Sequence, residues 1–366
     1  MKRLLIISLS LVLIFLSSAA LLGQDISRFQ VGGDFRLRIR YDDITDEAPR
    51  TRTSVRFRLN TTLLVYNKLF LYFGFATGTG DPRNRNMAFE DYFSTKPIWI
   101  DHAYLEWRLF NQLVFLGGKM QNPFWRPTSF LWDSDLTPEG FAIQGDTFTF
   151  PLSIFYSAGM YIVNEIKSLD DPLLIPIQAG FEYAFENGNS IKFGGTFYLF
   201  TNLENIDPLD PYDSYSEYSP LSNTLEGNSL KYKYNSAAAG IEIFFMSVLP
   251  PYIPTVTLIG ECIYNFDPPA ENFGYLAGLK LGHLDVFSFK EWRVFYAYVH
   301  LERDSWLDIF PESTYLSGTT NITGHSITAD IGVANRIWVR LQFGYATEIV
   351  GDKRQFLGAA DLNLRF

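Results

Sequence analysis

The sequence predicts an all-β protein, a transmembrane antiparallel β-barrel of about sixteen strands, with fourteen or eighteen strands as the alternatives. Three observations predict this fold. Segments of alternating apolar and polar residues recur along the chain, an export signal stands at its start, and aromatic residues make up 17% of it. Beyond the export signal, no apolar run reaches the roughly 18 residues that a membrane-spanning helix needs.

Residues 1–23 have the pattern of a secretory signal peptide. Two basic residues precede an apolar run over 4–16, and small residues follow it. We expect cleavage after Ala20 or Gly23, with an uncleaved membrane anchor as the alternative. Because no linker-like tract interrupts the later pattern, residues 24–366 are predicted to form a single barrel domain.

Alternation is clearest in the first two strands of the mature chain. Arg36, Arg38 and Arg40 alternate with apolar residues in the first strand, as Arg56 and Arg58 do in the second. Residues two apart share a face of a strand, so each strand has one apolar and one basic face. With these two, the predicted strands are 34–41, 54–65, 68–77, 98–109, 112–119, 139–145, 153–163, 174–185, 191–200, 229–245, 254–265, 273–282, 289–302, 325–335, 337–346 and 355–366.

The connections between these strands alternate in length. Counted from the N-terminus, the four longest are all odd-numbered, namely 78–97, 120–138, 201–228 and 303–324. Outer-membrane barrels have short periplasmic turns and longer outer loops, so we expect the odd connections to face outward. The acidic loop 201–228 is expected to shield the outer mouth, with cation or sugar binding as the alternative.

The arginines of the first two strands predict a basic wall inside the barrel. A charged side chain on the lipid face costs roughly 2–4 kcal/mol near the bilayer midplane, so these arginines should face the lumen. The alternative is a solvated face of a soluble barrel. The predicted wall consists of Arg36, Arg38, Arg40, Arg56 and Arg58.

The third outer loop, 120–138, is the candidate constriction, because it is aromatic and acidic together. Folded inward, it would set carboxylates against the basic wall, and opposed charges of this kind select solutes in pores. A loop that only packs on the rim is the alternative. The candidate constriction residues are Trp125, Arg126, Trp132, Asp133, Asp135 and Glu139.

Two features of the chain resemble known outer-membrane proteins. The blocks Phe35–Arg38, Lys96–Trp107, Gly117–Phe124 and Trp132–Gly140 together resemble the "putative porin" family. This resemblance covers roughly 30–145 and implies an outer-membrane barrel with a pore, without naming a substrate or a catalytic residue. The chain also ends on a strand that closes with Phe366. Such an end resembles the signal that the barrel-assembly machinery reads, and an ordinary edge strand is the alternative.

Composition and motifs exclude several other functions. A formal net charge of −10 argues against nucleic acid as a partner, and the single Cys262 excludes an internal disulfide. None of the four histidines has metal-site spacing, and the glycine-rich segment 78–81 opens no helix, so we expect no enzymatic activity, cofactor or metal.

The sequence therefore predicts a porin in the bacterial outer membrane, through which small hydrophilic solutes or ions diffuse passively. A non-conducting structural or adhesive barrel is the alternative, and an outer-membrane lipid hydrolase is less favoured. The expected partners are membrane lipid, the barrel-assembly machinery and the solutes. The sequence leaves a monomer and a trimer equally open.

Overall fold

The computed structural model describes residues 28–366 except 91, 111, 168, 211–213, 250–251 and 315. The predicted signal peptide, 1–23, lies outside the described residues, as do Asn111 and the proline pair at 250–251 in two predicted turns.

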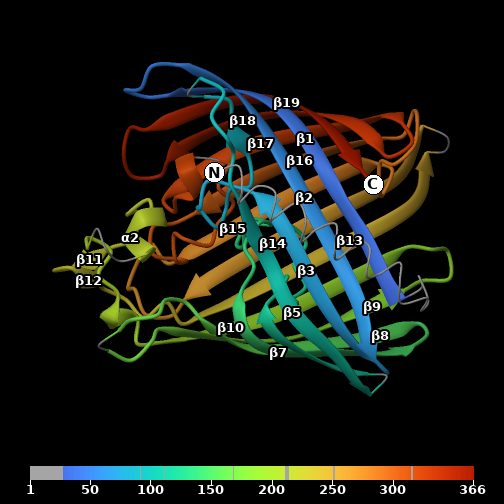
Figure 1. The fold of residues 1–366 in the computed structure, drawn as a ribbon, viewed down its shortest axis with the longest axis horizontal. Coiled ribbons are helices and arrows are strands. Elements are labelled where there is room, and N and C mark those ends of the chain that lie inside the picture. The colour runs from blue at the N-terminus through green and yellow to red at the C-terminus, as the bar shows by residue number, and fades with distance from the viewer. Residues whose placement is uncertain are drawn as a thin grey trace, which may run out of the picture.

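The chain forms a closed antiparallel barrel of sixteen long strands, in which each strand pairs with its neighbours in sequence and β1 pairs with β19 (Figure 1). An additional two-residue strand, β4 (Met87–Ala88), pairs with β2 beside the short β3. The sixteen wall strands are β1 (Phe29–Ile44), β2 (Arg50–Tyr66), β3 (Leu69–Thr77), β5 (Ile98–Phe110), β6 (Leu113–Lys119), β7 (Glu139–Thr149), β8 (Leu152–Ile162), β9 (Leu173–Ala184), β10 (Ser190–Thr201), β13 (Ser236–Leu249), β14 (Ile253–Asn265), β15 (Phe273–Gly282), β16 (Trp292–Leu301), β17 (Ile322–Ala334), β18 (Ile337–Glu348) and β19 (Arg354–Arg365).

Each of the sixteen predicted segments overlaps one of these strands, with several boundaries shifted by three to five residues and one by seven. The predicted strand 229–245 begins only at Ser236, because the residues before it belong to the outer loop. Within that loop, β11 (Leu225–Glu226) and β12 (Ser229–Leu230) form a small hairpin. Tyr234 is fully buried there, and its hydroxyl donates to Asp304 at 2.7 Å, so packing between loops overrides the local alternation.

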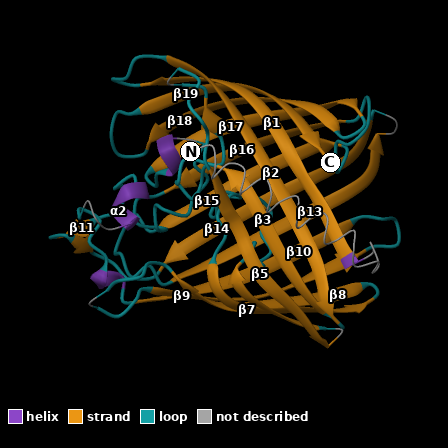
Figure 2. Ribbon diagram, in the orientation of Figure 1, coloured by secondary structure: helices purple, strands orange, loops and turns teal. Residues whose placement is uncertain are grey.

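Long loops gather at one end of the barrel and short turns at the other (Figure 2). The loop end carries the only regular helices of the described outer loops, α2 (Ser214–Tyr218), η2 (Leu203–Asn205) and η3 (Leu316–Gly318). Among the described residues, no helix is long and apolar enough to cross a membrane. Loop length and strand direction together place the short turns and the last strand's end on the periplasmic side.

The apolar face of each strand points outward, where it is available to lipid. On β1, Phe35 is 38% exposed and Ile39 54%, whereas on β19 the inward Asp361 is 2% exposed. Alternation also decides which aromatic residues can contact headgroups. Two strand aromatics, Tyr198 and Phe244, lie on the lumen side, since Tyr198 packs 4.6 Å from Trp306 and Phe244 lines a lumen cavity.

The barrel closes where its first and last strands meet. β1 and β19 pair from Asp34–Arg365 to Ile44–Gln355. Beyond that ladder, Phe366 exchanges two backbone hydrogen bonds of 3.0 Å with Gly33, and its ring stacks 6.2 Å from Phe57. The C-terminal residue is therefore part of the wall.

The apolar core of the molecule lies between the outer loops and inward-facing apolar residues of the wall, such as Leu276 on β15 and Leu301 on β16. Loops 120–138, 202–235 and 302–321 all contribute to it. Trp306 and Leu307 at its centre are fully buried. Two buried aspartates reinforce the packing, and the carboxylate of one, Asp308, accepts hydrogen bonds from three serine or tyrosine hydroxyls of loop 202–235.

Candidate functional site

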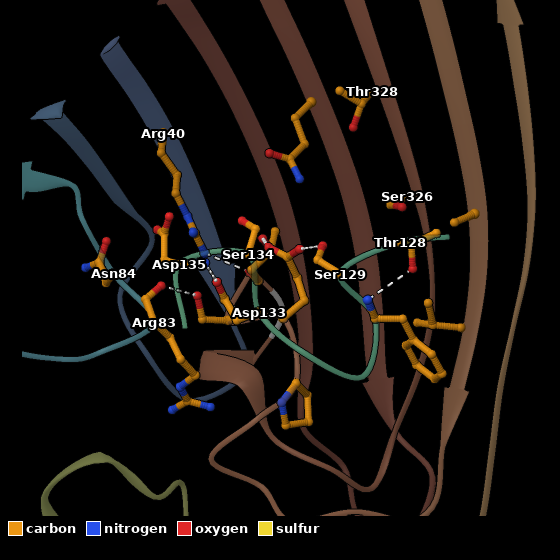
Figure 3. A pocket seen from close by; sticks show the side chains of 18 of the residues that line it. Arg40, Arg83, Asn84, Thr128, Ser129, Asp133, Ser134, Asp135, Ser326 and Thr328 are labelled. Carbon is orange, nitrogen blue, oxygen red and sulfur yellow. Dashed lines mark hydrogen bonds between the residues drawn. The ribbon is translucent and has the colours of Figure 1, made fainter. Parts of the chain in front are cut away.

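A polar cavity of about 550 Å³ lies inside the barrel, between the strand wall and three loops, 78–97, 120–138 and 302–321. In Figure 3, Arg40 from β1 and Asp133 and Asp135 from loop 120–138 point into the same space. Nine basic and six acidic residues line this cavity, a formal excess of three positive charges. The strand wall supplies seven arginines and Lys280, whereas most of the acidic residues come from the loops.

The arginines of the wall share their carboxylates in a regular way. Each of four wall aspartates lies within 3.4 Å of two arginines, so eight guanidinium groups meet four carboxylates. The wall therefore keeps an excess of positive charge even where every carboxylate is engaged. The four sets are Asp34 with Arg56 and Arg58, Asp42 with Arg40 and Arg52, Asp330 with Arg293 and Arg340, and Asp361 with Arg36 and Arg38.

Strand register brings five of these charges into one row across five adjacent strands. Successive cross-strand partners alternate in sign around the wall, and like charges directly opposite would repel. The row begins and ends with arginine, so its charge is not balanced. In order from β1 to β16 it runs Arg38, Asp361, Arg340, Asp330 and Arg293.

The β1–β2 ladder places arginine directly opposite arginine twice, and in one pair, Arg40 and Arg52, both guanidinium groups bond to Asp42. Arg36 on β1 lies directly opposite Arg56 on β2, and its other neighbour, on β19, is the neutral Asn363. The Nε of Arg36 donates to Asn363 Oδ1 at 2.9 Å, and Asp361 approaches only to 3.4 Å. Arg36 is therefore the wall arginine whose charge is compensated least closely.

Loop 120–138 rests on the inner face of β9, β10 and β13. The backbone N–H of Trp125 donates to the Gln178 side chain at 2.8 Å, and the Gln178 amide donates back to the Trp125 carbonyl at 2.8 Å. Two glycines make room for the indole, since a Cβ on Gly194 would lie 2.8 Å from its ring and one on Gly240 would lie 3.3 Å away. The loop thus fills one side of the lumen.

The same loop is joined to loop 302–321. Trp132 stacks on Phe310 with 4.6 Å between ring centroids, and the Trp306 indole donates to the Leu131 carbonyl at 2.7 Å. The Asp133 carboxylate accepts a hydrogen bond of 2.9 Å from the backbone N–H of Ser313. The two loops form one packed unit that bounds the cavity opposite the arginines.

Electrostatics of this loop unit differ from those of the wall. Burial raises the pKa of Asp133 to about 7, with the nearby Glu312 and Asp135 carboxylates adding to the effect. Burial also lowers the pKa of Arg126. At neutral pH, the carboxyl group of Asp133 is therefore divided between its charged and protonated forms, which weakens the negative side of the cavity.

The predicted site residues fall into three groups. Four of the five predicted wall arginines line the cavity, and the fifth, Arg58, bonds to Asp34 at 2.7 Å and reaches Asp135 at 3.4 Å. Asp133 and Asp135 also line the cavity, whereas Trp125, Arg126 and Trp132 pack beneath the loop around a space of about 30 Å³.

Glu139 does not join these residues. It begins β7, bonds to Lys119 at 2.8 Å, and its side chain is 62% exposed. It shares strand parity with the outward-facing Phe141, so it points away from the lumen at the outer rim.

Sequence reasoning missed the acidic half of the wall and part of its basic half. The missed residues do alternate with apolar residues in the late strands, which is a signal for the lumen face. Their pairing with the first strands could not be predicted, because it depends on the register between strands. The missed residues include Asp330, Asp361, Arg293 and Arg340.

A second polar cavity, of about 440 Å³, lies on the periplasmic side. It reaches the turn residues Gly188 and His283 and shares Lys280 and Arg293 with the larger cavity. Over the described part of the chain, no group of three or more His, Cys, Asp or Glu residues could hold a metal ion.

The profile of the family described as "Putative porin" matches residues 39–237 and 261–366. The chain belongs to this porin family. A search of curated protein sequences gave no match. Family and fold together locate this porin in the bacterial outer membrane.

Solved barrels resemble this porin in fold but not in sequence. OprB of Pseudomonas putida, in its high-pH structure, gives a TM-score of 0.59 at 10% identity, over 93% of this chain and 94% of that one. OmpF of Salmonella typhi, in complex with daunomycin, gives 0.53 at 9% identity over 92% and 97%. A loop-L8 deletion mutant of Vibrio cholerae OmpT gives 0.50 at 11% identity over 93% and 100%.

Proposed function

We propose that this porin is a passive diffusion pore for small hydrophilic solutes and ions, narrowed by loop 120–138. The observation that carries the proposal is the sharing of Lys280 and Arg293 by the two cavities. The two cavities therefore adjoin at these residues, the larger reaching the outer ends of β1 and β19 and the smaller reaching the periplasmic turns.

The chemistry of the lining supports water and polar solutes rather than lipid. Charged and polar side chains together line most of the larger cavity, and burial of ionised groups is tolerable only with water or paired charges beside them. An apolar ligand would have to displace that hydration without replacing its hydrogen bonds, so the lining favours hydrophilic cargo.

A non-conducting barrel is the second candidate, and the packed outer loops favour it. Loops 120–138, 202–235 and 302–321 share one apolar core over part of the mouth, and Trp306 in that core is fully buried. In this role the outer surface would bind a partner and the lumen would stay closed to current.

Single-channel recording in a planar bilayer separates the two candidates. Purified, refolded protein should produce discrete conductance steps in 1 M KCl. A barrel that shows heat-modifiable migration on a gel, and is therefore folded, but gives no steps would contradict the pore and favour the structural role.

A further inference from the structure

We propose that the part of the larger cavity lined by Arg36 and Arg56, with Asn363 beside Arg36 on the neighbouring strand, binds a small oxyanion, a carboxylate or a phosphate group. The proposal rests on the proposed pore function for its biological meaning, because it names the class of solute that the pore prefers. It rests on the structure for its site, which two independent observations define.

The first observation is the incomplete pairing of Arg36. Its side chain is 12% exposed and faces the cavity, yet its closest partner is an amide oxygen. Within the part of the chain that the structure describes, its two Nη atoms donate to no acceptor within hydrogen-bond distance. A guanidinium held out of bulk water is stabilised by an anionic acceptor, and its planar fork matches a carboxylate or phosphate.

The second observation is an unsatisfied donor beside it. Asn363 is 2% exposed, and its Nδ2 has no hydrogen-bond partner. A buried donor without an acceptor costs roughly as much as a lost hydrogen bond, so such groups are rare unless a ligand or water completes them. The Oδ1 of the same amide is already engaged by Arg36, which fixes the orientation of Nδ2 as the donor end.

Charge around this part of the cavity favours an anion over water alone. Arg56 lies directly opposite Arg36 in the strand register, and the carboxylate that bonds to Arg56 is shared with Arg58. Adjacent guanidinium groups repel each other, and an oxyanion between them removes that repulsion. The excess of positive charge along the cavity would also raise the local concentration of anions.

The test measures how inorganic phosphate reduces chloride current through the channel, with malonate as a second probe. With the native protein, each probe should lower the chloride conductance in a saturable manner, and the more effective probe identifies the preferred headgroup. Arg36→Gln should weaken the effect by about tenfold or more, the loss of a charged hydrogen bond. The matched control is Arg354→Gln, which removes one charge from an exposed residue outside the cavity and should leave the block unchanged.

A second variant keeps the shape of the site and reverses its chemistry. Asn363→Asp places a carboxylate where the amide stands, so Arg36 gains an ion pair within the barrel. We expect this variant to lose the block by phosphate and by malonate while still conducting chloride.

The possible results distinguish failure of the anion site from failure of the pore function. Channels that open normally but respond to neither probe, or an Asn363→Asp variant that binds as the native protein does, would overturn the site and leave the pore function standing. If no current is seen, calorimetric titration of phosphate into the folded barrel in detergent decides the site alone. Binding that Arg36→Gln removes would support it, and absence of binding would overturn it.

Discussion

Arg38 and Asp361 form a two-point ion pair across the junction of the first and last strands. The Nε and Nη2 atoms of Arg38 donate to the two carboxylate oxygens of Asp361 at 2.7 and 2.8 Å, and Asp361 is 2% exposed. The same carboxylate lies 3.4 Å from Arg36. Charges that line the cavity therefore also hold the barrel closed.

Replacement of this carboxylate should weaken the barrel at its junction. Asp361→Asn leaves two guanidinium groups without their shared anion, and loss of one partner of a buried pair costs about 3 kcal/mol. We expect the variant to unfold at a lower temperature in a heat-modifiability gel. Asp352→Asn, at an exposed position in the last outer loop, is the matched control. Equal shifts for both variants would contradict a special role for Asp361.

Acidity should change the third loop through Asp133. Its pKa is raised from 3.8 to about 7 in the folded protein, so the folded form holds the proton more tightly than the unfolded chain. The stabilisation from this group is complete below pH 3.8 and is lost as the pH rises through about 7. Proteolysis within loop 120–138 should therefore be faster at pH 8 than at pH 5.

Asp133→Asn isolates this effect from other titrating groups. The variant should remove most of the difference in proteolysis rate between the two pH values. A difference that persists unchanged in the variant would assign the pH dependence to another group.

Shortening the third loop should widen the pore. Deletion of residues 124–135 removes the segment that bounds the cavity opposite the arginines, so single-channel conductance should increase at least about twofold if it scales with open area. Deletion of Glu47 and Ala48, which are exposed in the first outer loop, provides the control. A folded deletion barrel with native conductance would show that the loop does not limit the current.

The packing of the Trp125 indole against β10 can be tested at two neighbouring glycines. A Cβ on Gly194 would lie 2.8 Å from the indole, whereas one on Gly195 meets nothing within 4 Å. Gly194→Val should displace the indole, shift its fluorescence to longer wavelength, and destabilise the loop by about 1–3 kcal/mol. Gly195→Val should leave the fluorescence as it is. Identical spectra for the two variants would argue against the packing described.

The terminal Phe366 can be tested as both a structural residue and an assembly signal. Because its ring stacks on Phe57, Phe366→Ala should lower stability after refolding into lipid vesicles by about 1–2 kcal/mol. If the machinery also reads the residue, the yield of heat-modifiable barrel in cells should fall further than the yield in vesicles. An equal decrease in the two would restrict Phe366 to packing.

Alternation along the chain was sufficient to predict the barrel, because one strand face must meet lipid and the other must not. The same alternation was sufficient to predict that Arg36 and Arg38 face the lumen. It could not predict that Asp361 pairs with them, since that pairing depends on the register between strands more than 300 residues apart.

One candidate residue and one strand boundary differ from what was predicted from the sequence. Glu139 was grouped with the constriction residues by its charge, but it begins β7, as the predicted strand 139–145 implies, and strand parity turns it outward. The strand expected from residue 229 was displaced because Tyr234 is drawn into the core between loops. For the strand boundary, contacts distant in sequence decided the outcome.

The pairing of Asp361 with the first strand has a consequence for lateral opening of the barrel. Separation of β1 from β19 would leave Arg36 and Arg38 without the carboxylate that they share. Unpaired charges at an open edge next to hydrocarbon are strongly disfavoured. We therefore expect this junction to resist opening through its ion pairs as well as through its backbone hydrogen bonds.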